Sequence, residues 1–510
     1  MNVRLTGDPL RVDEVVAVAR DGAPVEVDPS VRARMAPGRA LVDAAVEREQ
    51  VVYGITTGFG ALAAVRIPRE EAVELQHAIV RSHAAGAGDP IDDEIVRGMM
   101  LLRARTLAAG HAGARPVLVE RIAALLNAGI TPVVPRYGSV GASGDLAPLA
   151  HCALALLGEG RVRVRDGGEP VAAGDALRAA GIEPVRLEAK EGLALVNGTE
   201  GMLAMLCLAL HDLDLLLRAA DVVCAMTVEA LLATDRPFAA ALHALRPHPG
   251  QAASAARLRA LTAGSGIIAS HRTAEHAVQD AYSLRCAPQV HGACRDTAAH
   301  ANAVAERELA SEVDNPVVLH EIGAVESAGN FHGEPVAFAL DFLAIAACEI
   351  ASISERRTDR MLDPAHSNGL PAFLAPKAGV NSGFMLAQYT QAALVSDCKR
   401  LAVPASVDTI PTSGTTEDHV SMGFHAGLKI RGSLANVRIV LAVEALCAAQ
   451  ALDLRAPLTP SPAAAAAAAV LRESVEPMLA DRELSPQIER AAALLPSMVE
   501  AADASAGGIA

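Results

Sequence analysis

Apolar residues recur at spacings of three and four along most of the chain, which is the period of an α-helix with one buried face. This pattern predicts helices over residues 92–128, 145–158, 200–235, 295–312, 335–360, 385–401, 425–455 and 463–500. The longer segments carry Ala and Leu on several faces, so we expect a large bundle whose helices are buried nearly all round. Strand signals are few and short, at 24–27, 130–134 and 161–171. The fold is therefore predicted to be mainly α.

Glycine- and proline-rich segments interrupt this helical pattern, and several of them carry polar side chains. They cover residues 53–60, 83–88, 136–144, 246–250 and 412–416. Functional side chains concentrate in loops that a rigid scaffold positions. These segments are therefore the first candidates for catalytic or binding residues.

The composition excludes several classes of protein. Apolar residues make up 51% and charged residues 20% of the 510 residues, which is typical of a folded globular protein and not of a disordered one. The formal net charge is −15 and there is no Trp, which argues against nucleic-acid binding. The N-terminal residues are charged, and the longest apolar stretches are interrupted by acidic residues, as in Ala337 to Ile350. We expect a cytoplasmic protein that binds neither nucleic acid nor membrane.

The eight cysteines form no C-x-x-C pair, and most lie in apolar helical segments. Buried, reduced thiols are the expected state of such residues. The sixteen histidines include no H-E-x-x-H motif and no Cys/His ligand cluster. We therefore expect no metal.

Residues 136–151 (RYGSVGASGDLAPLAH) form the most informative segment. A phosphate-binding loop would end in Gly-Lys-Ser/Thr, whereas Gly144 is followed by Asp145, whose charge would repel a phosphate. The nucleophile elbow G-x-S-x-G and the dinucleotide fingerprint do not fit this segment either. Taken alone, the segment predicts a tight glycine turn before a helix, with Asp145 near the helix cap.

A second, chemical interpretation of the same residues stays open. If the fold presses the Gly144 nitrogen onto the Ala142 carbonyl, a five-membered ring can close. Loss of two waters, one of them from the Ser143 hydroxyl, would leave a methylidene group conjugated to an imidazolone. Glycine is required because a side chain would hinder ring closure, and serine is required because its hydroxyl can be eliminated. The product would be an electrophile made from the chain itself.

GSVGASGDLAPLAH strongly resembles the signature of the aromatic amino acid ammonia-lyases that carry this methylidene-imidazolone (MIO) group. The resemblance extends from about residue 50 to about residue 450. It includes YGITTGFG (53–60), RSHAAGAG (81–88), KEGLALVNGTE (190–200), VQDAYSLRCAPQV (278–290), GNFHGEPVA (329–337) and PASVDTIPTS…EDHVSMG (404–423). Within the family, the sequence is most similar to the histidine-specific enzymes.

The resemblance implies a mechanism for eliminating ammonia from an α-amino acid. The amine is a poor leaving group, and an electrophile formed from Ala142, Ser143 and Gly144 would capture it. Asp145 would support ring formation. The β-proton is weakly acidic, and Tyr53 is the family's candidate base. Free Tyr titrates near pH ~10, so the site would have to favour its phenolate.

Further roles follow from the same matching segments. Arg285 would bind the substrate carboxylate, because a guanidinium pairs with a carboxylate through two hydrogen bonds. Tyr282 and Gln279 would hydrogen-bond the substrate or the MIO group. Asn197 would contact the MIO oxygen and the carboxylate, and Phe331 would pack over the ring.

Substrate choice would depend on His83 and Glu417, which match residues that contact the imidazole in histidine-specific enzymes. Glu417 could accept the imidazole N–H or help to take up the β-proton. Those enzymes usually have Gln before this Glu, and here Thr416 stands in that place. We expect L-histidine to be converted to trans-urocanate and ammonia. A tyrosine or phenylalanine ammonia-lyase, a 2,3-aminomutase and a catalytically silent homologue are the alternatives.

The resemblance also implies an architecture. A long-helix core of the fumarase/aspartase type would follow a smaller N-terminal domain, with residues 1–112 carrying Tyr53 and His83 and residues 113–510 carrying the MIO loop. Family members are homotetramers whose active sites combine residues from several subunits. The substrate would be a small amino acid, with no external cofactor.

Overall fold

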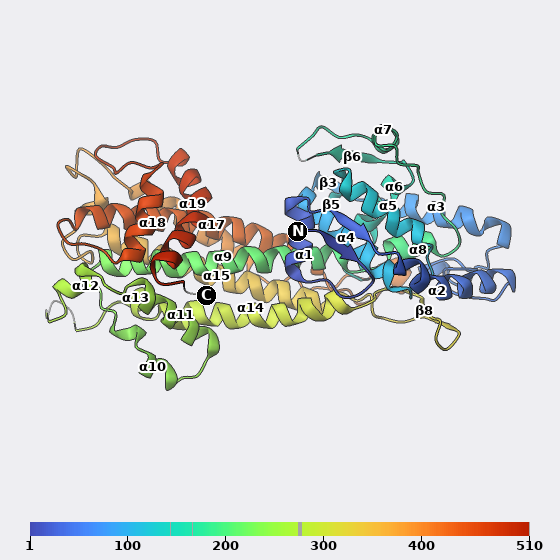
Figure 1. Cartoon of the computed structure of the whole chain (residues 1–510), viewed down its shortest axis with the longest axis horizontal. Coiled ribbons are helices and arrows are strands. Elements are labelled where there is room, and N and C mark those ends of the chain that lie inside the picture. The colour runs from blue at the N-terminus through green and yellow to red at the C-terminus, as the bar shows by residue number, and fades with distance from the viewer. Residues whose placement is uncertain (143, 166, 274–277, 509–510) are drawn as a thin grey trace. The chain divides into compact units, whose positions relative to one another are not determined.

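The computed structural model describes residues 1–142, 144–165, 167–273 and 278–508. The chain divides into two compact units (Figure 1). Unit 1 comprises Met1–His211, Ala301–Asp341 and Pro404–Leu428, and unit 2 comprises Asp212–His300, Phe342–Val403 and Lys429–Ala510. Four long helices contribute residues to both units: α9 (Glu200–Ala230), α14 (Ala287–Ala310), α15 (Glu334–Leu362) and α17 (Gly423–Leu454).

Unit 1 contains short strands as well as helices. Its other helices are α1 (Val12–Asp21), α2 (Ser30–Glu47), α3 (Ala72–His83), α4 (Asp93–Ala109), α5 (Pro116–Asn127), α6 (Leu146–Leu156), α7 (Ala173–Ala179) and α8 (Glu191–Val196), with 3₁₀ turns η1 (Gly60–Leu62), η2 (Arg69–Glu71) and η5 (Ser413–Thr415). Its strands are β1 (Val3–Leu5), β2 (Val25–Val27), β3 (Ala87–Pro90), β4 (Ile130–Pro132), β5 (Pro135–Tyr137), β6 (Arg161–Val164), β7 (Val171–Ala172), β8 (Val317–Leu319) and β9 (Ala324–Glu326).

These strands form small sheets at the edges of the helices. Strands β1 and β2 pair in parallel, whereas β3–β5, β4–β6–β7 and β8–β9 pair antiparallel. In β8–β9, Val317 pairs with Glu326 and Leu319 with Ala324. This hairpin keeps the residues on either side of it close together, which matters for the site described below.

Helix α4 lies at the centre of unit 1, where it packs against α1, α2 and α5. Every residue from Ile95 to Ala109 is buried, so the helix is buried all round, as its sequence predicts. Two of its arginines find backbone partners: Arg105 Nη1 donates to the Ser311 carbonyl at 2.5 Å, and Arg103 Nη1 donates to the Val313 carbonyl at 3.2 Å. Helix α4 thereby anchors the segment that follows α14. Helices α3, α6 and α8 pack against one another in the same unit.

The remaining helices of unit 2 are α10 (Ala240–Ala244), α11 (Pro249–Leu261), α12 (Gly266–Ser270), α13 (Tyr282–Arg285), α16 (Met385–Leu401), α18 (Pro462–Arg472) and α19 (Ser485–Ser505), with 3₁₀ turns η3 (Arg236–Phe238) and η4 (Ala372–Leu374).

A buried polar cluster joins the four long helices inside unit 2. His291 on α14 contacts Asp221 on α9, with Nδ1 and Oδ1 2.7 Å apart. Arg357 on α15 donates to both carboxylate oxygens of Glu444 on α17, at 2.5 and 2.8 Å. Buried charges require such pairing, because an unpartnered charge in the interior is strongly destabilising.

The mainly α fold is confirmed, and most predicted helices are found with small shifts at their ends. Two predicted segments are each split in two. Segment 92–128 breaks between α4 and α5, where Gly110 adopts φ +107° and Pro116 starts the next helix, because neither residue continues a helix favourably. Segment 463–500 breaks between α18 and α19, and 161–171 forms the separate strands β6 and β7.

The boundary predicted between residues 112 and 113 lies inside unit 1, and the domain division around it stays a prediction. Among the described residues, α15 is the one helix long and apolar enough to cross a membrane, and 67% of its apolar window is buried. Burial of this kind is typical of a core helix in a water-soluble fold.

Candidate active site

Four of the predicted site residues line one cavity in unit 1, although they come from widely separated parts of the chain. Tyr53, His83, Asn197 and Glu417 line a space of about 410 Å³. The other lining residues are mainly apolar or small: Gly58, Phe59, Gly60, Leu62, Val65, Ile67, Leu75, Ala78, Ile79, Ser82, Leu146, Leu193, Asn315 and Ser413. An apolar cavity with a few convergent polar groups is the usual form of a small-molecule site.

Tyr53 is fixed by its own loop. Its ring meets Phe59 edge-on, with centroids 6.5 Å apart and planes at 86°. Its hydroxyl oxygen accepts a hydrogen bond from the Gly60 backbone N–H at 3.0 Å. A side chain on Gly60 would place its Cβ 2.5 Å from Ser413 Oγ, so this loop lies against the loop that carries Glu417. The close approach explains why glycine stands at that position.

His83 and Glu417 contribute the titratable groups on another part of the cavity wall. Burial lowers the pKa of His83, although the Ile79 carbonyl and the Glu417 carboxylate oppose this shift. His83 Nδ1 lies 3.2 Å from Ser82 Oγ. Glu417 Oε2 accepts a hydrogen bond from Thr412 Oγ1 at 2.8 Å, and the backbones of the same two residues pair with each other. A neutral imidazole is thus available near neutral pH on the same cavity wall as the oriented Glu417 side chain.

Thr416, the residue that departs from the histidine-specific pattern, is exposed and does not line the cavity. Its backbone N–H donates to the Ser413 carbonyl at 3.2 Å. Thr416 therefore lies next to Glu417 in the sequence and outside the cavity wall.

The glycine turn before α6 is as tight as the sequence predicts. The Gly144 nitrogen lies 2.6 Å from the Ala142 oxygen, and Gly144 adopts φ +74°. A Cβ on Gly144 would lie 2.0 Å from the Gly198 carbonyl oxygen, so only glycine fits. The turn is held from outside by Ser421, whose Oγ donates to the Gly141 carbonyl at 2.9 Å. Ser143 lies outside the described residues.

Asp145 occupies the N-cap position of α6, but its side chain does not cap that helix. It accepts hydrogen bonds from Ser139 Oγ at 2.8 Å and from the Met202 backbone N–H, in the first turn of α9, at 2.9 Å. The predicted capping role therefore applies to a different helix from the one that Asp145 precedes. Complete burial raises the pKa of Asp145 to about 7, and these hydrogen bonds oppose the shift.

Asn197 follows α8 and is buried at the cavity wall. Its Nδ2 donates to the Asn315 carbonyl at 2.9 Å, and its own carbonyl accepts from Arg103 Nη1 at 2.9 Å. Among the described residues, its Oδ1 is buried without a hydrogen-bond partner. A buried polar atom of this kind requires an explanation, and a bound group in the cavity is one.

An ion pair that the sequence did not predict fixes the other end of α8. Lys190, which precedes α8, places its Nζ 2.6 Å from Asp314 Oδ2, and both side chains are buried. Burial lowers the pKa of Lys190, although Asp314 opposes this effect. The segment Asp314–Asn315 is thereby tied to both ends of α8. No motif in the sequence signals this pair, because the two residues are far apart along the chain.

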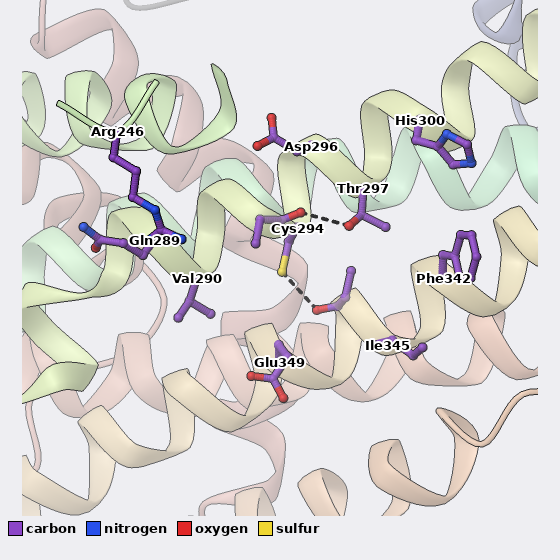
Figure 2. Close-up of a pocket in the computed structure, with 12 residues that line it drawn as sticks. Arg246, Gln289, Val290, Cys294, Asp296, Thr297, His300, Phe342, Ile345 and Glu349 are labelled. Atoms are coloured by element: carbon purple, nitrogen blue, oxygen red, sulfur yellow. Dashed lines mark hydrogen bonds between the residues drawn. The ribbon is translucent and has the colours of Figure 1, made fainter. Parts of the chain in front are cut away.

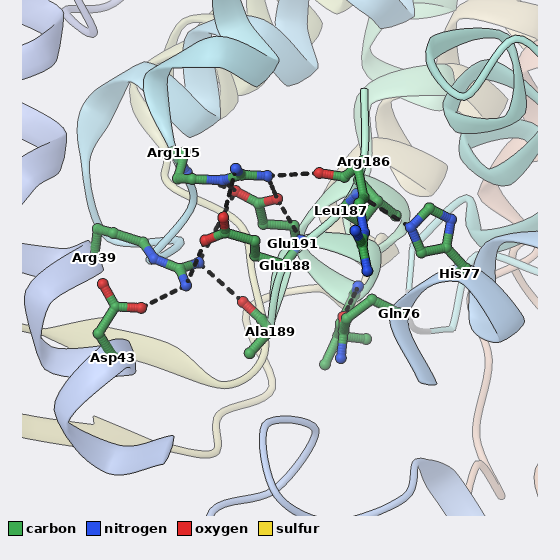
Figure 3. Close-up of polar contacts among 11 residues, drawn as sticks. Arg39, Asp43, Gln76, His77, Arg115, Arg186, Leu187, Glu188, Ala189 and Glu191 are labelled. Carbon is green, nitrogen blue, oxygen red and sulfur yellow. Dashed lines mark hydrogen bonds and ion pairs between the residues drawn. The ribbon is translucent and has the colours of Figure 1, made fainter. Parts of the chain in front are cut away.

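A network of charged side chains holds the segment before α8 (Figure 3). Arg115 donates to both carboxylate oxygens of the buried Glu191 at 2.8 and 2.7 Å, and to Glu188 at 2.7 Å. Gln76 Oε1 on α3 accepts from the Leu193 N–H at 3.2 Å. Since α3 ends in His83 and α8 leads into Asn197, this network fixes two of the cavity residues relative to each other.

The other predicted site residues lie elsewhere. Phe331 is half-buried in unit 1, two residues before Gly333, whose N–H donates to the Gly141 carbonyl of the glycine turn at 3.3 Å. Gln279, Tyr282 and Arg285 belong to unit 2.

Within unit 2, Arg285 and Tyr282 contact each other. The Arg285 guanidinium lies over the Tyr282 ring, 4.6 Å from its centroid, and Nε donates to the Asp280 carbonyl at 2.8 Å. Gln279 and Tyr282 are exposed. The structure therefore brings together four of the predicted side chains in one cavity, and the three in unit 2 do not line it.

The sequence model of the aromatic amino acid lyases matches residues 10–473. The chain belongs to the aromatic amino acid lyase family. It is 55% identical to a histidine ammonia-lyase from Streptomyces avermitilis over 98% of this chain and 97% of that protein.

Solved structures of family members are similar over nearly the whole chain. A histidine ammonia-lyase from Trypanosoma cruzi has 40% identity and a TM-score of 0.90, covering 99% of this chain and 95% of that one. A tyrosine aminomutase from Streptomyces globisporus has 39% identity and a TM-score of 0.92, covering 99% and 98%. The expected family and the long-helix lyase fold are confirmed, and the chain is a carbon–nitrogen lyase of the ammonia-lyase type.

Proposed function

We propose that the chain is a histidine ammonia-lyase that converts L-histidine to trans-urocanate and ammonia, the first step of histidine degradation. The observation that carries this proposal is the convergence of His83 and Glu417 on the same cavity as Tyr53 and Asn197. A phenylalanine-specific cavity would favour apolar groups in place of this imidazole and carboxylate. The names of the curated relatives, which are 49–56% identical to this chain, support the same substrate.

The residues present fit an MIO group formed from Ala142, Ser143 and Gly144. The Gly144 nitrogen already lies against the carbonyl group with which it would bond, at 2.6 Å from the oxygen. Gly144 has no room for a side chain, and the buried Asn197 Oδ1 lacks a partner among the described residues. Once formed, the group supplies an electrophilic carbon that binds the substrate amine and makes it a better leaving group.

The chain's own residues perform the rest of the reaction. Tyr53 removes the β-proton. The hydrogen bond that its hydroxyl oxygen accepts from the Gly60 N–H holds this oxygen in a fixed orientation for the proton transfer. Asn197, held by Asn315 and Arg103, orients the substrate near the glycine turn. Asp145, whose pKa is about 7, can exist in either protonation state near neutral pH. That property suits a residue that supports ring formation from the adjacent backbone.

The substrate imidazole would be recognised by one donor–acceptor pair. Burial keeps His83 neutral by lowering its pKa, so one ring nitrogen can donate to the substrate while the other interacts with Ser82. Glu417, oriented by Thr412, accepts the imidazole N–H. A site built to hydrogen-bond a polar ring rejects an apolar ring, because the buried polar groups would then be left unpaired.

We also propose a cytoplasmic homotetramer with active sites shared between subunits, in which Arg285, Tyr282 and Gln279 of one chain complete the site of another. Exposed apolar side chains on unit 2 support association: Phe342 and Ile345 on α15 are 43% and 44% exposed. They line a cavity of about 750 Å³ between α14 and α15 (Figure 2). Apolar side chains exposed together on one helix face are a common feature of protein–protein interfaces.

The sharing of sites has its own test. Tyr53→Phe and Arg285→Ala chains should each be inactive as homotetramers. Mixed tetramers assembled from both should regain part of the activity, because some sites would then receive both wild-type residues. Mixed assemblies that stay inactive would contradict the sharing of sites, and a light-scattering mass of a single chain would contradict the tetramer.

The activity is tested with L-histidine, L-tyrosine and L-phenylalanine as parallel substrates, by the absorbance of the unsaturated product, with Ser143→Ala as the control. We expect urocanate from the wild-type chain and none from the control. Intact mass should show a two-water deficit in the wild type only. Turnover of an aromatic substrate in place of histidine would favour the tyrosine or phenylalanine alternatives, and β-amino acid as product would identify an aminomutase. If none of the three substrates is converted and the mass deficit is absent, a catalytically silent homologue would be favoured.

A further inference from the structure

Two histidines and a glutamate converge at one edge of unit 1, outside the cavity. His111 lies in the turn after α4, and His320 and Glu321 lie in the turn between β8 and β9. One ligand atom from each of the three residues lies within 4.8 Å of the other two. The turns are joined through the backbone, because Val318 N–H donates to the His111 carbonyl at 2.8 Å. The three side chains therefore belong to one fixed piece of structure.

The spacing of these atoms suits a tetrahedral metal ion. His111 Nε2 lies 2.9 Å from Glu321 Oε1, and His320 Nε2 lies 3.5 Å from the same oxygen. Bonds of about 2.0–2.1 Å at tetrahedral angles place ligand atoms about 3.3–3.4 Å apart. These two spacings lie on either side of this value, and the ligand atoms of the two histidines lie within 4.8 Å of each other. Side-chain rotations that bring the two imidazoles closer together would complete the geometry.

A fourth residue orients the first histidine. His111 Nδ1 lies 2.6 Å from Glu312 Oε2. Metal-binding histidines commonly donate the second ring N–H to a carboxylate, which fixes the tautomer and makes the ligating nitrogen more basic. Glu312 holds His111 in this way, with Nε2 directed at Glu321. The His111 and His320 rings also pack together, with centroids 5.0 Å apart.

We propose that His111, His320 and Glu321 bind a divalent transition-metal ion of the Zn²⁺ class, with Glu312 as the supporting carboxylate. The imidazole ligands favour such an ion over Mg²⁺ or Ca²⁺, which take oxygen ligands. The His111, His320 and Glu321 side chains are 24%, 22% and 57% exposed, so an ion can enter from solvent and a water can fill the fourth position. The sequence pattern predicted no metal, because His111 is far from His320 and Glu321 along the chain.

A metal ion at this site would stabilise the fold near the cavity and would take no part in the reaction. Between Glu312 and His320 lie Asp314, which pairs with Lys190, and Asn315, which lines the cavity. An ion that ties His111 to the β8–β9 turn would close this stretch at both of its ends. Since it binds only the folded chain, the ion stabilises the fold according to its affinity and concentration. The proposal does not depend on which amino acid is the substrate.

The test uses the untagged full chain, treated with a chelator and desalted. We expect Zn²⁺ to bind with one equivalent per chain by calorimetry, and Co²⁺ to give the visible absorption of a tetrahedral nitrogen and oxygen site without thiolate charge transfer. Zn²⁺ should raise the midpoint of thermal unfolding, and Mg²⁺ should not. Absence of stoichiometric Zn²⁺ binding would overturn the proposal.

Variants assign the site. His320→Ala and Glu321→Gln should each abolish the stoichiometric binding, and Glu312→Gln should weaken it by about 10- to 100-fold. His366→Ala is the matched control, because His366 also lies 2.6 Å from a carboxylate, that of Asp363, on an exposed surface of unit 2. The control should bind like the wild type. Equal binding by His320→Ala and the wild type, or equal loss in His366→Ala, would show adventitious binding and overturn the assignment.

Discussion

The buried pair Lys190–Asp314 should couple the stability of unit 1 to the geometry of the cavity. In Lys190→Met, an apolar side chain of similar length replaces the ammonium group. Among the described residues, Asp314 then keeps one hydrogen bond, which its Oδ1 accepts from the Asn315 N–H at 2.8 Å. Removing one partner of a buried ion pair leaves an uncompensated charge and costs about 3–5 kcal/mol. Both side chains are almost fully buried, at 0% and 4% exposure, so the upper part of this range applies.

The double variant Lys190→Met/Asp314→Asn separates the pair from the packing. It removes both charges, and the amide keeps the oxygen that accepts from Asn315. Because replacing a whole buried pair is far less costly than breaking it, we expect the double variant to recover most of the stability lost in Lys190→Met. The coupling between the two substitutions should therefore exceed about 1 kcal/mol, as expected of residues in direct contact.

The measurement is urea-induced unfolding followed by circular dichroism, with turnover of L-histidine as a second readout. Lys190→Met should lower both the unfolding midpoint and the turnover, because Asn315 and Asn197 would lose their fixed spacing. Arg178→Met is a matched control, since its ion pair with Asp175 is exposed at 77% and 70% and should contribute at most about 1 kcal/mol. A Lys190→Met chain as stable as this control, or a double variant no better than the single one, would refute the reasoning.

Two further predictions concern the glycine turn. The pKa of Asp145 is about 7 in the folded chain, against a reference value of 3.8. Its contribution to the free energy of unfolding is therefore fully present below pH 3.8 and is lost as the pH rises through 7. The loss amounts to about 4 kcal/mol. In a Ser143→Ala background, Asp145→Asn should flatten this decline in pH-dependent unfolding, and an unchanged slope would contradict the burial argument. Gly144→Ala should abolish both turnover and the two-water mass deficit. Gly181→Ala is the control, because Gly181 also has a positive φ, +68°, but has open space around it. This control should lose only about 1–3 kcal/mol of stability through backbone strain and should retain turnover and the mass deficit.

The sequence predicted the fold where local pattern decides it. Helix α16 begins and ends at the predicted residues, because its apolar period is regular and bounded by turn residues. The break between α4 and α5 was missed, because apolar spacing continues across Gly110 while the backbone changes direction there. The β8–β9 hairpin was missed as well, because strands this short carry too little pattern to be distinguished from loops.

The candidate site could be predicted only through the resemblance to a family. Nothing in the local sequence signals that Tyr53 and Glu417 line one cavity, since more than half of the chain lies between them. The roles assigned to Arg285 and Tyr282 stay predictions, because these residues lie in the other unit. The ion pair Lys190–Asp314 could not be predicted at all: each residue has other charged residues near it in the sequence, and their pairing is a property of tertiary packing.

The close approach of Gly144 to Gly198 has a consequence for attempts to transplant this chemistry. A Cβ on Gly198 would lie 2.0 Å from Glu200 Oε2 and 2.2 Å from Arg103 Nη1, so the backbone at Gly198 is as crowded as that at Gly144. A designer who grafts Ala-Ser-Gly into another scaffold would obtain an ordinary flexible tripeptide. The smallest unit that could be transplanted is the turn together with Gly198, which packs against it, and the buried Arg103–Glu200 pair that packs against Gly198.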